Sequence, residues 1–141
     1  MLRRPPLALE IVVLGGLVAV LHYIATDRGL YWSIDWVDAV AHFLGGLWVG
    51  LFAAFVFFTQ RWLTLPIGSR RLTAAVIVLS VLAVGLSWEL YEIFTGLTDT
   101  ATDLRDTLSD VASDFLGGVA SLGYLRTALT PVAPDCRSNE Q

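Results

Sequence analysis

Lysine is absent from this sequence, and only 16% of its 141 residues are charged. A soluble domain of this length rarely has so few charged side chains, whereas a content of 55% hydrophobic residues is typical of a short membrane protein with several spans. The formal net charge is −4, and acids near one membrane surface carry it. This balance excludes a nucleic-acid-binding surface and makes membrane lipids the expected partners.

The sequence also has almost no cysteine and no recognisable cleavage site. Cys136 is the only cysteine and stands in a polar tail, which excludes an internal disulfide and a cysteine-based metal site. The start MLRRPP, followed by an apolar run, is similar to a signal peptide, but no small-residue cleavage site precedes Asp27 and Arg28. We therefore expect the first apolar segment to be retained as a membrane span.

Four apolar segments are present, each close to the roughly 20 residues that cross the hydrocarbon core of a bilayer. The predicted helical spans cover residues 7–25, 35–58, 72–94 and 104–125. Together they form a single all-α transmembrane domain over residues 1–130, followed by a polar cytoplasmic tail over residues 131–141.

The arginines are unevenly distributed between the two membrane surfaces. Only Arg28 and Arg105 fall on the side opposite the two termini. The others lie on the same side as the termini: Arg3, Arg4, Arg61, Arg70, Arg71, Arg126 and Arg137. Because cytoplasmic loops carry an excess of basic residues, both termini are predicted to be cytoplasmic.

A nine-residue motif occurs twice in the chain. DAVAHFLGG over residues 38–46 is echoed by DVASDFLGG over residues 110–118, and each copy has a second polar group four residues after its first acid. The second and fourth predicted spans run in the same direction. The repeat therefore relates two helical hairpins by a pseudo-two-fold axis along the membrane normal. The paired glycines would permit a close approach of the two helices.

Three of the predicted spans bring carboxylates to the same depth, in the outer leaflet. Asp38 and His42 lie one helical turn apart, while Glu89 and Glu92 share one helix face. The predicted metal ligands are Asp38, His42, Glu89, Glu92, Asp106, Asp110 and Asp114. Each carboxylate at the centre of a bilayer costs about 2.5–3.5 kcal/mol on insertion scales, so these charges require compensation.

A divalent cation is the first form of compensation. A histidine among carboxylates suits Mn, Fe or Zn, and an oxygen-dominated ligand set suits Mg or Ca. Protonated carboxylates in a hydrogen-bonded network, or a water-filled vestibule, are the alternatives. His22 is predicted to be interfacial rather than part of this site, and Glu10 is predicted to pair with Arg3 or Arg4.

Short motifs in this order resemble the VanZ-like membrane proteins, especially their YjdF-type inner-membrane branch. The matching strings are AHFLGG at residues 41–46, WELYE at residues 88–92 and DTLSD at residues 106–110. The resemblance implies a multi-pass protein of the bacterial inner membrane with a role at the cell envelope, since the name-giving member is associated with glycopeptide-antibiotic resistance. This chain departs from that family in two ways. It has acids at Glu92 and Asp114, where Gln and Asn are frequent, and its Arg-to-Asp spacing near Arg105 is one residue short.

The preferred hypothesis is an outward-opening site that binds a divalent cation and acts on an envelope lipid or a lipid-linked phosphate compound. His42 and Glu89 are the candidate general base and ligand, and Arg105 is the outer cation placed to meet a phosphate. Whether the protein is an enzyme stays open. The alternatives are a proton- or cation-coupled transporter that works as a homodimer, and a non-enzymatic scaffold with a structural cation. Glu10 is the only acid in the cytoplasmic half, which favours a one-sided site.

Overall fold

The computed structural model describes residues 7–34, 36–59, 70–96 and 104–128, and within these ranges the chain folds into helices and contains no strand. The long helices are α1 (Leu7–Asp27), α3 (Trp36–Ala54), α4 (Arg70–Thr95) and α5 (Leu104–Ala128). A short helix, α2 (Leu30–Ser33), follows α1, and a π-helical turn, η1 (Phe55–Thr59), extends α3. The all-helical part of the prediction is confirmed, while the predicted tail lies outside the described residues.

Three of the described helices are long and apolar enough to cross a membrane. They cover Leu7–Asp27, Trp36–Phe58 and Arg70–Thr95. Helix α5 has sufficient length, with 25 residues. Its acids and small polar residues make it less apolar than the other three, so its length and composition alone do not establish the predicted fourth span.

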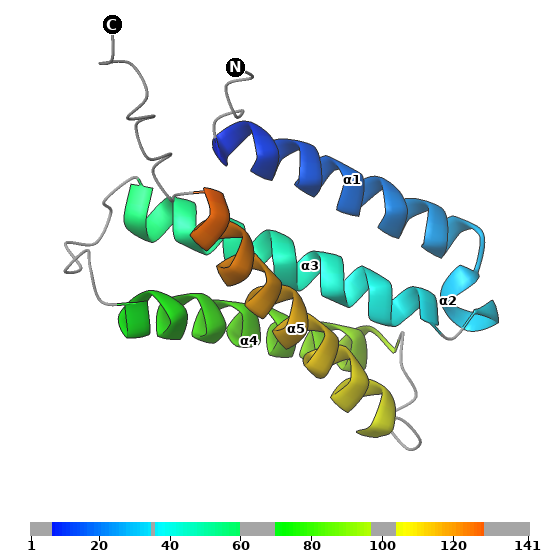
Figure 1. Ribbon diagram of the computed structural model, residues 1–141. Coiled ribbons are helices and arrows are strands. Elements are labelled where there is room, and N and C mark those ends of the chain that lie inside the picture. Colours follow the sequence, from blue (N-terminus) through cyan, green and yellow to red (C-terminus); the bar gives the residue numbers. More distant parts are fainter. Residues whose placement is uncertain (1–6, 35, 60–69, 97–103, 129–141) are drawn as a thin grey trace, which may run out of the picture.

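Helix α3 lies at the centre of the bundle. It packs most extensively along α5, and α4 and α1 also pack on it. Figure 1 shows that α3 and α5 run in the same direction and cross, while α1 and α4 run in the opposite direction. The start of α1 and the end of α5 therefore share one end of the bundle, called the terminal end below. The end of α1 and the start of α5 share the other, called the site end.

Glycines allow α3 and α5 to cross at close range. A Cβ atom added at Gly46 would collide with the backbone carbonyl oxygen of Asp114, and one added at Gly117 would collide with that of Phe43. Only glycine leaves room for the two backbones at these points. Each copy of the repeated motif thus supplies one glycine to the crossing.

A second glycine feature turns the chain between α1 and α2. Gly29 has a φ of 62°, in the left-handed region that residues with a side chain rarely adopt. The Ser33 hydroxyl donates a hydrogen bond to the Gly29 carbonyl oxygen at 3.0 Å and closes the turn. Helix α2 therefore folds back beside the end of α1, which places Tyr31 next to His22.

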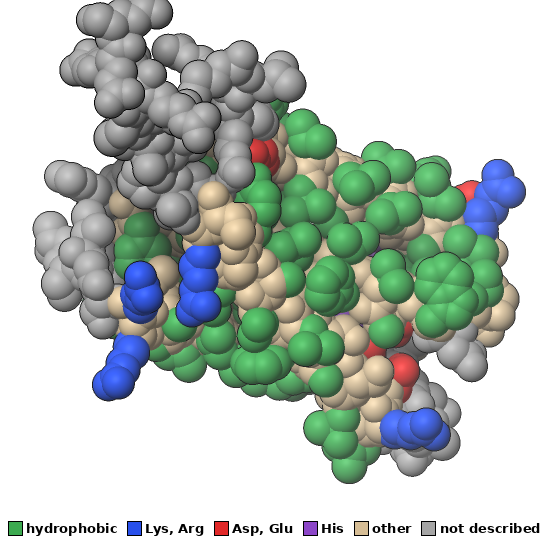
Figure 2. Space-filling view, in the orientation of Figure 1, with side chains coloured by type: hydrophobic (Ala, Val, Ile, Leu, Met, Phe, Trp, Pro, Cys, Tyr) green, Lys and Arg blue, Asp and Glu red, His purple; other side chains and the backbone are tan. Residues whose placement is uncertain are grey.

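The hydrophobic core occupies the terminal half of the bundle. Its buried members are Ile11, Leu51, Ala54, Ile77, Val81 and Leu125. The Trp48 indole N–H donates a hydrogen bond to the carbonyl oxygen of Ile11 at 2.9 Å and ties α1 to α3. Figure 2 shows hydrophobic side chains over much of the visible surface, as expected for a bundle surrounded by lipid.

Arginines lie at both ends of the bundle (Figure 2). At the terminal end, Arg70 and Arg71 begin α4, and Arg126 lies near the end of α5. At the site end, Arg28 follows α1 and Arg105 lies near the start of α5. The other arginines on which the predicted orientation rests lie outside the described residues: Arg3, Arg4, Arg61 and Arg137.

Candidate functional site

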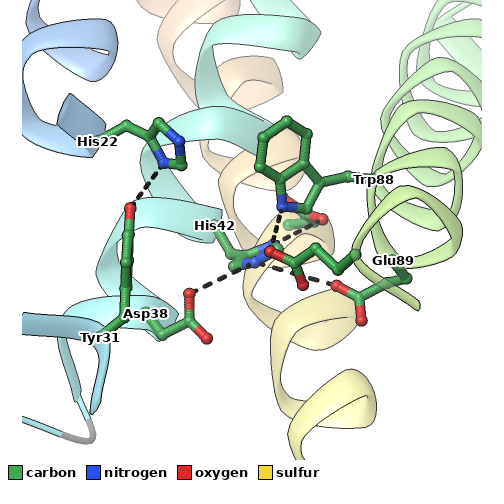
Figure 3. Close-up of polar contacts among 8 residues, drawn as sticks. His22, Tyr31, Asp38, His42, Trp88 and Glu89 are labelled. Carbon is green, nitrogen blue, oxygen red and sulfur yellow. Dashed lines mark hydrogen bonds and ion pairs between the residues drawn. The ribbon is translucent and has the colours of Figure 1, made fainter. Parts of the chain in front are cut away.

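His42 is the centre of a buried polar cluster between α3, α4 and α5. Its side chain is 8% exposed. The Nε2 atom lies 3.6 Å from Asp38 Oδ1 and 4.0 Å from Glu89 Oε1. The Nδ1 atom lies 3.3 Å from Asp114 Oδ2. Figure 3 shows the carboxylates of Asp38 and Glu89 on either side of the imidazole ring. Residues from three helices therefore meet at one ring.

The two ring nitrogens of His42 have different surroundings. Asp114 is placed to accept a hydrogen bond from Nδ1–H. When one imidazole nitrogen carries the proton, the other presents a lone pair, and this is how carboxylates orient metal-binding histidines. In this tautomer the Nε2 lone pair would face Asp38 and Glu89, which suits a cation held between them. Asp114 would then position the ring.

Gly85 makes room for the Asp114 side chain. A Cβ atom added at Gly85 would collide with Asp114 Oδ2, whereas one at Gly45 would make only an ordinary van der Waals contact with Asp114 Oδ1, at 3.9 Å. Asp114 is 6% exposed. Its carboxylate is thus wedged between α3 and α4, where its freedom to move away from His42 is small.

Asp38, His42 and Asp110 form a group that fits one metal ion. One donor atom from each lies within 4.8 Å of the other two. Zn–ligand distances of about 2.0–2.2 Å, and Ca–oxygen distances of about 2.3–2.6 Å, place donors of a shared ion within this range. Asp110 is 3% exposed, whereas the Asp38 side chain is partly open. The group therefore has a closed side and an open side.

Glu89 adds a buried carboxylate oxygen to the cluster. The residue is 5% exposed, and Oε1 has no hydrogen-bond partner within the described part of the chain; its contact with His42 Nε2 is 4.0 Å long. Leaving a buried polar atom unpaired costs about 1–3 kcal/mol, and more for a charged group. A cation, a proton or a water molecule would remove this penalty. Glu89 Oε1 faces the same ring nitrogen as Asp38, so it points into the predicted site.

The other predicted site residues are not among the ion-pair and hydrogen-bond partners of His42 within the described residues. The Glu92 carboxylate accepts a hydrogen bond from the Trp88 indole N–H at 2.8 Å, one turn away on α4. Arg105 and Asp106 are exposed at the start of α5, and Arg105 forms no ion pair within the described part of the chain. The structure thus brings five of the predicted residues together: Asp38, His42, Glu89, Asp110 and Asp114.

Three aromatic residues at the site end did not enter the predicted site. Tyr31 and His22 share a hydrogen bond of 2.9 Å between the hydroxyl and Nδ1. The rings of His22 and Trp88 are perpendicular, with centroids 5.5 Å apart. Burial, followed by the nearby Asp38 and Glu92 carboxylates, raises the pKa of Tyr31 to about 12. His22 was predicted to be interfacial, and the short connection with Gly29 is the sequence signal that brings Tyr31 back toward α1.

In the terminal half, Glu10 forms a contact that the sequence did not predict. Its carboxylate accepts a hydrogen bond from the Tyr124 hydroxyl at 2.6 Å, which joins α1 to α5. The predicted pairing of Glu10 with Arg3 or Arg4 lies outside the described residues. Glu10 is far along the bundle from His42, because it lies at the start of α1.

The sequence matches a protein family described as predicted membrane protein (DUF2238), and the match covers residues 1–131. No curated protein and no solved structure matches it. The family description supports a membrane location. The finer resemblance to the VanZ-like proteins and their YjdF-type branch stays a prediction.

Proposed function

Since the chain belongs to the DUF2238 family of predicted membrane proteins, we propose that it is an integral membrane protein whose helix bundle holds a divalent cation. His42 Nε2, Asp38 and Asp110 are the ligands, Glu89 faces them from α4, and Asp114 positions the His42 ring. The observation that carries the proposal is the convergence of three donor atoms within 4.8 Å of one another. The buried Oε1 atom of Glu89, which accepts no hydrogen bond from any described residue, supports it independently.

The proposed topology has four spans, with α5 as the fourth, arranged as two parallel-repeated hairpins. Helices α3 and α5 run in the same direction, which is what two such hairpins require (Figure 1). Burial of the acidic face of α5 against α3 explains how a less apolar helix tolerates lipid around it. Both termini are cytoplasmic in this proposal, as the distribution of arginines indicates, and the site faces the outside of a bacterial inner membrane.

The proposed activity is on an envelope lipid or a lipid-linked phosphate compound. A cation held beside the open side chain of Asp38 would polarise a phosphoryl oxygen or activate water. Glu89 is the candidate general base, since its free oxygen faces the cation position. Arg105, exposed at the rim, is the candidate group to meet the phosphate.

The described part of the chain argues against transport as the main function. A transport path needs polar groups through the whole membrane. Below the site, most of the buried side chains of the described residues are apolar, among them Leu51, Ile77 and Val81, and Ser121 is the buried polar exception. Two alternatives stay open: a transporter that works as a homodimer, and a scaffold with a purely structural cation. A measurement of substrate turnover separates both from the proposal.

Metal content of the detergent-purified full chain tests the proposal. We expect one Mn²⁺ or Zn²⁺ per chain by elemental analysis and calorimetry, and loss of this metal in Asp110→Asn. Asp27→Asn is the matched control, because Asp27 is an exposed acid that pairs with Arg28 at 3.4 Å at the same end of the bundle. Absence of metal in the parent after incubation with Mg, Mn, Zn and Ca would overturn the proposal, and so would equal metal content in Asp110→Asn and the parent.

A further inference from the structure

A second polar cluster lies beside the candidate cation site. We call it the aromatic cluster and define it as His22, Tyr31, Trp88 and Glu92. Its members come from α1, α2 and α4, and Figure 3 shows His22, Tyr31 and Trp88 gathered at the same side of the bundle as His42. Nothing in the proposed cation site uses these side chains, since none of them is among the ligands.

The geometry of the aromatic cluster is more specific than a row of interfacial rings. The Trp88 ring packs edge-on against the His22 ring, with centroids 5.5 Å apart. Its indole N–H donates a hydrogen bond to Glu92 Oε1 at 2.8 Å. Tyr31 is tied to His22 by the 2.9 Å hydrogen bond. The side chains therefore contact one another across three helices. Aromatic residues that merely mark a membrane surface have no need of such mutual contacts.

The charge around this cluster selects the kind of ligand. Seven carboxylates lie at the site end within the described residues: Asp27, Asp38, Glu89, Glu92, Asp106, Asp110 and Asp114. Two arginines oppose them within the described residues, and one of these, Arg28, already pairs with Asp27. One divalent cation would leave the surroundings negative. A second anionic group is repelled by such a site, whereas a positively charged group is attracted.

The aromatic cluster has the side chains that recognise an ammonium group. Ring faces of Trp and Tyr attract ammonium ions through their quadrupole, and a nearby carboxylate supplies the counter-charge. Trp88 is 37% exposed, and its ring centroid lies 5.5 Å from those of His22 and Tyr91, so the residue reaches the surface with neighbouring rings around it. Glu92 is held in place by the Trp88 N–H and brings its negative charge to the same spot.

We propose that the aromatic cluster binds an alkylammonium group, so that the ligand of the site combines an ammonium with the phosphate that reaches the cation. This inference rests on the proposed function only for the phosphate part of the ligand, which the cation would bind. The same chemistry occurs in the headgroup of an aminophospholipid and in a soluble phosphorylated amine. The two sources differ in whether the ligand arrives from the bilayer or from water.

Calorimetry on the Mn²⁺-loaded full chain tests the inference with phosphoethanolamine as the probe. We expect Trp88→Leu and Glu92→Gln to weaken phosphoethanolamine binding by about tenfold or more, since each removes a part of the ammonium site. Trp88→Phe keeps a ring face without the N–H donor and should lose less. Trp32→Leu is the control, because Trp32 is 67% exposed at the same end and lies outside the cluster.

Further arms separate the outcomes. Retention of phosphatidylethanolamine over phosphatidylglycerol in nanodiscs, lost in Glu92→Gln, would identify a lipid headgroup as the source. Binding of free phosphoethanolamine without lipid selectivity would identify a soluble amine. Equal phosphoethanolamine affinity in the parent, Trp88→Leu and Glu92→Gln would overturn the inference, as would a preference for inorganic phosphate alone. Failure to bind Mn²⁺ would count against the proposed function alone. In that case the ammonium site is tested separately, by calorimetry with ethylammonium in the absence of metal.

Discussion

At the scale of single residues, the two ring nitrogens of His42 have different partners, and this difference decides what the site can do. Nδ1 is engaged by Asp114, and Nε2 faces Asp38 and Glu89. A ligand and its orienting carboxylate respond differently to substitution. Loss of a ligand removes the metal, whereas loss of the orienting charge weakens metal binding by about 10- to 100-fold.

Asp114→Asn tests this assignment. The amide oxygen still accepts a hydrogen bond from Nδ1–H but lacks the charge, so we expect Mn²⁺ affinity to fall by about 10- to 100-fold with unchanged stoichiometry. Asp106→Asn, on the exposed part of the same helix, should change the affinity by less than about threefold, since Asp106 is exposed to solvent. If both variants weaken binding equally, total charge rather than ring geometry controls the site.

Tyr31 provides a residue-scale prediction about pH. Its pKa is raised to about 12 by burial and then by Asp38 and Glu92, against an ordinary value of about 10. The folded protein therefore keeps this proton between pH 10 and 12, where the unfolded chain loses it. The associated stabilisation is complete below pH 10 and disappears as the pH rises to 12.

The tyrosinate absorbance of the folded protein measures this directly. Tyr31→Phe should remove a titration step close to pH 12, and Tyr23→Phe, at an exposed position on α1, should leave that step in place. A step that persists in Tyr31→Phe would contradict the placement of Tyr31 beside the acids.

At the scale of helices, the crossing of α3 and α5 depends on glycine at some positions and not at others. A Cβ atom at Gly117 would collide with the Phe43 carbonyl oxygen, whereas one at Gly123, on the same helix, would meet nothing within 4 Å. We expect Gly117→Ala to destabilise the protein by about 1–3 kcal/mol. Gly123→Ala should stabilise it by about 0.5–1 kcal/mol, because alanine is the better helix former. Thermal unfolding in detergent compares the two, and shifts of the same sign would refute the crossing.

Helices were the part of the fold that the sequence could predict best. The predicted spans at residues 7–25 and 72–94 lie within α1 and α4, because long apolar runs mark helices of this length. The π-helical turn after Ala54 was not predicted, since hydropathy does not register a change in hydrogen-bond spacing. Helix periodicity placed Asp38 and His42 on one face of the same helix. It could not place Tyr31 near them, because the position of Tyr31 depends on how α2 folds back.

At the scale of the whole molecule, the polar and apolar interiors are separated along the bundle. The acids and His42 lie toward the site end, and the core around Ile77 and Val81 lies toward the terminal end. The sequence predicted this separation because Glu10 is the only acid among the predicted spans in the terminal half. It did not predict which acids would touch, because contacts between helices depend on how the helices cross and rotate.

The single cysteine makes the orientation of the whole chain testable. Cys136 belongs to the predicted cytoplasmic tail. We expect a membrane-impermeant maleimide to label it only after the cells are permeabilised. In a Cys136→Ser background, Ser33→Cys in α2 should be labelled in intact cells, because Ser33 is exposed at the site end. The reverse pattern would invert the proposed topology.

The apolar core beneath the site has an electrical consequence. A charge that crosses a whole bilayer gains or loses about 2.3 kcal/mol per 100 mV of membrane potential. In the proposed topology a cation reaches His42 from the outside and stops above Leu51, Ile77 and Val81, so it traverses only part of the field. Its affinity should therefore respond only weakly to voltage, and its binding should pass no current across the membrane.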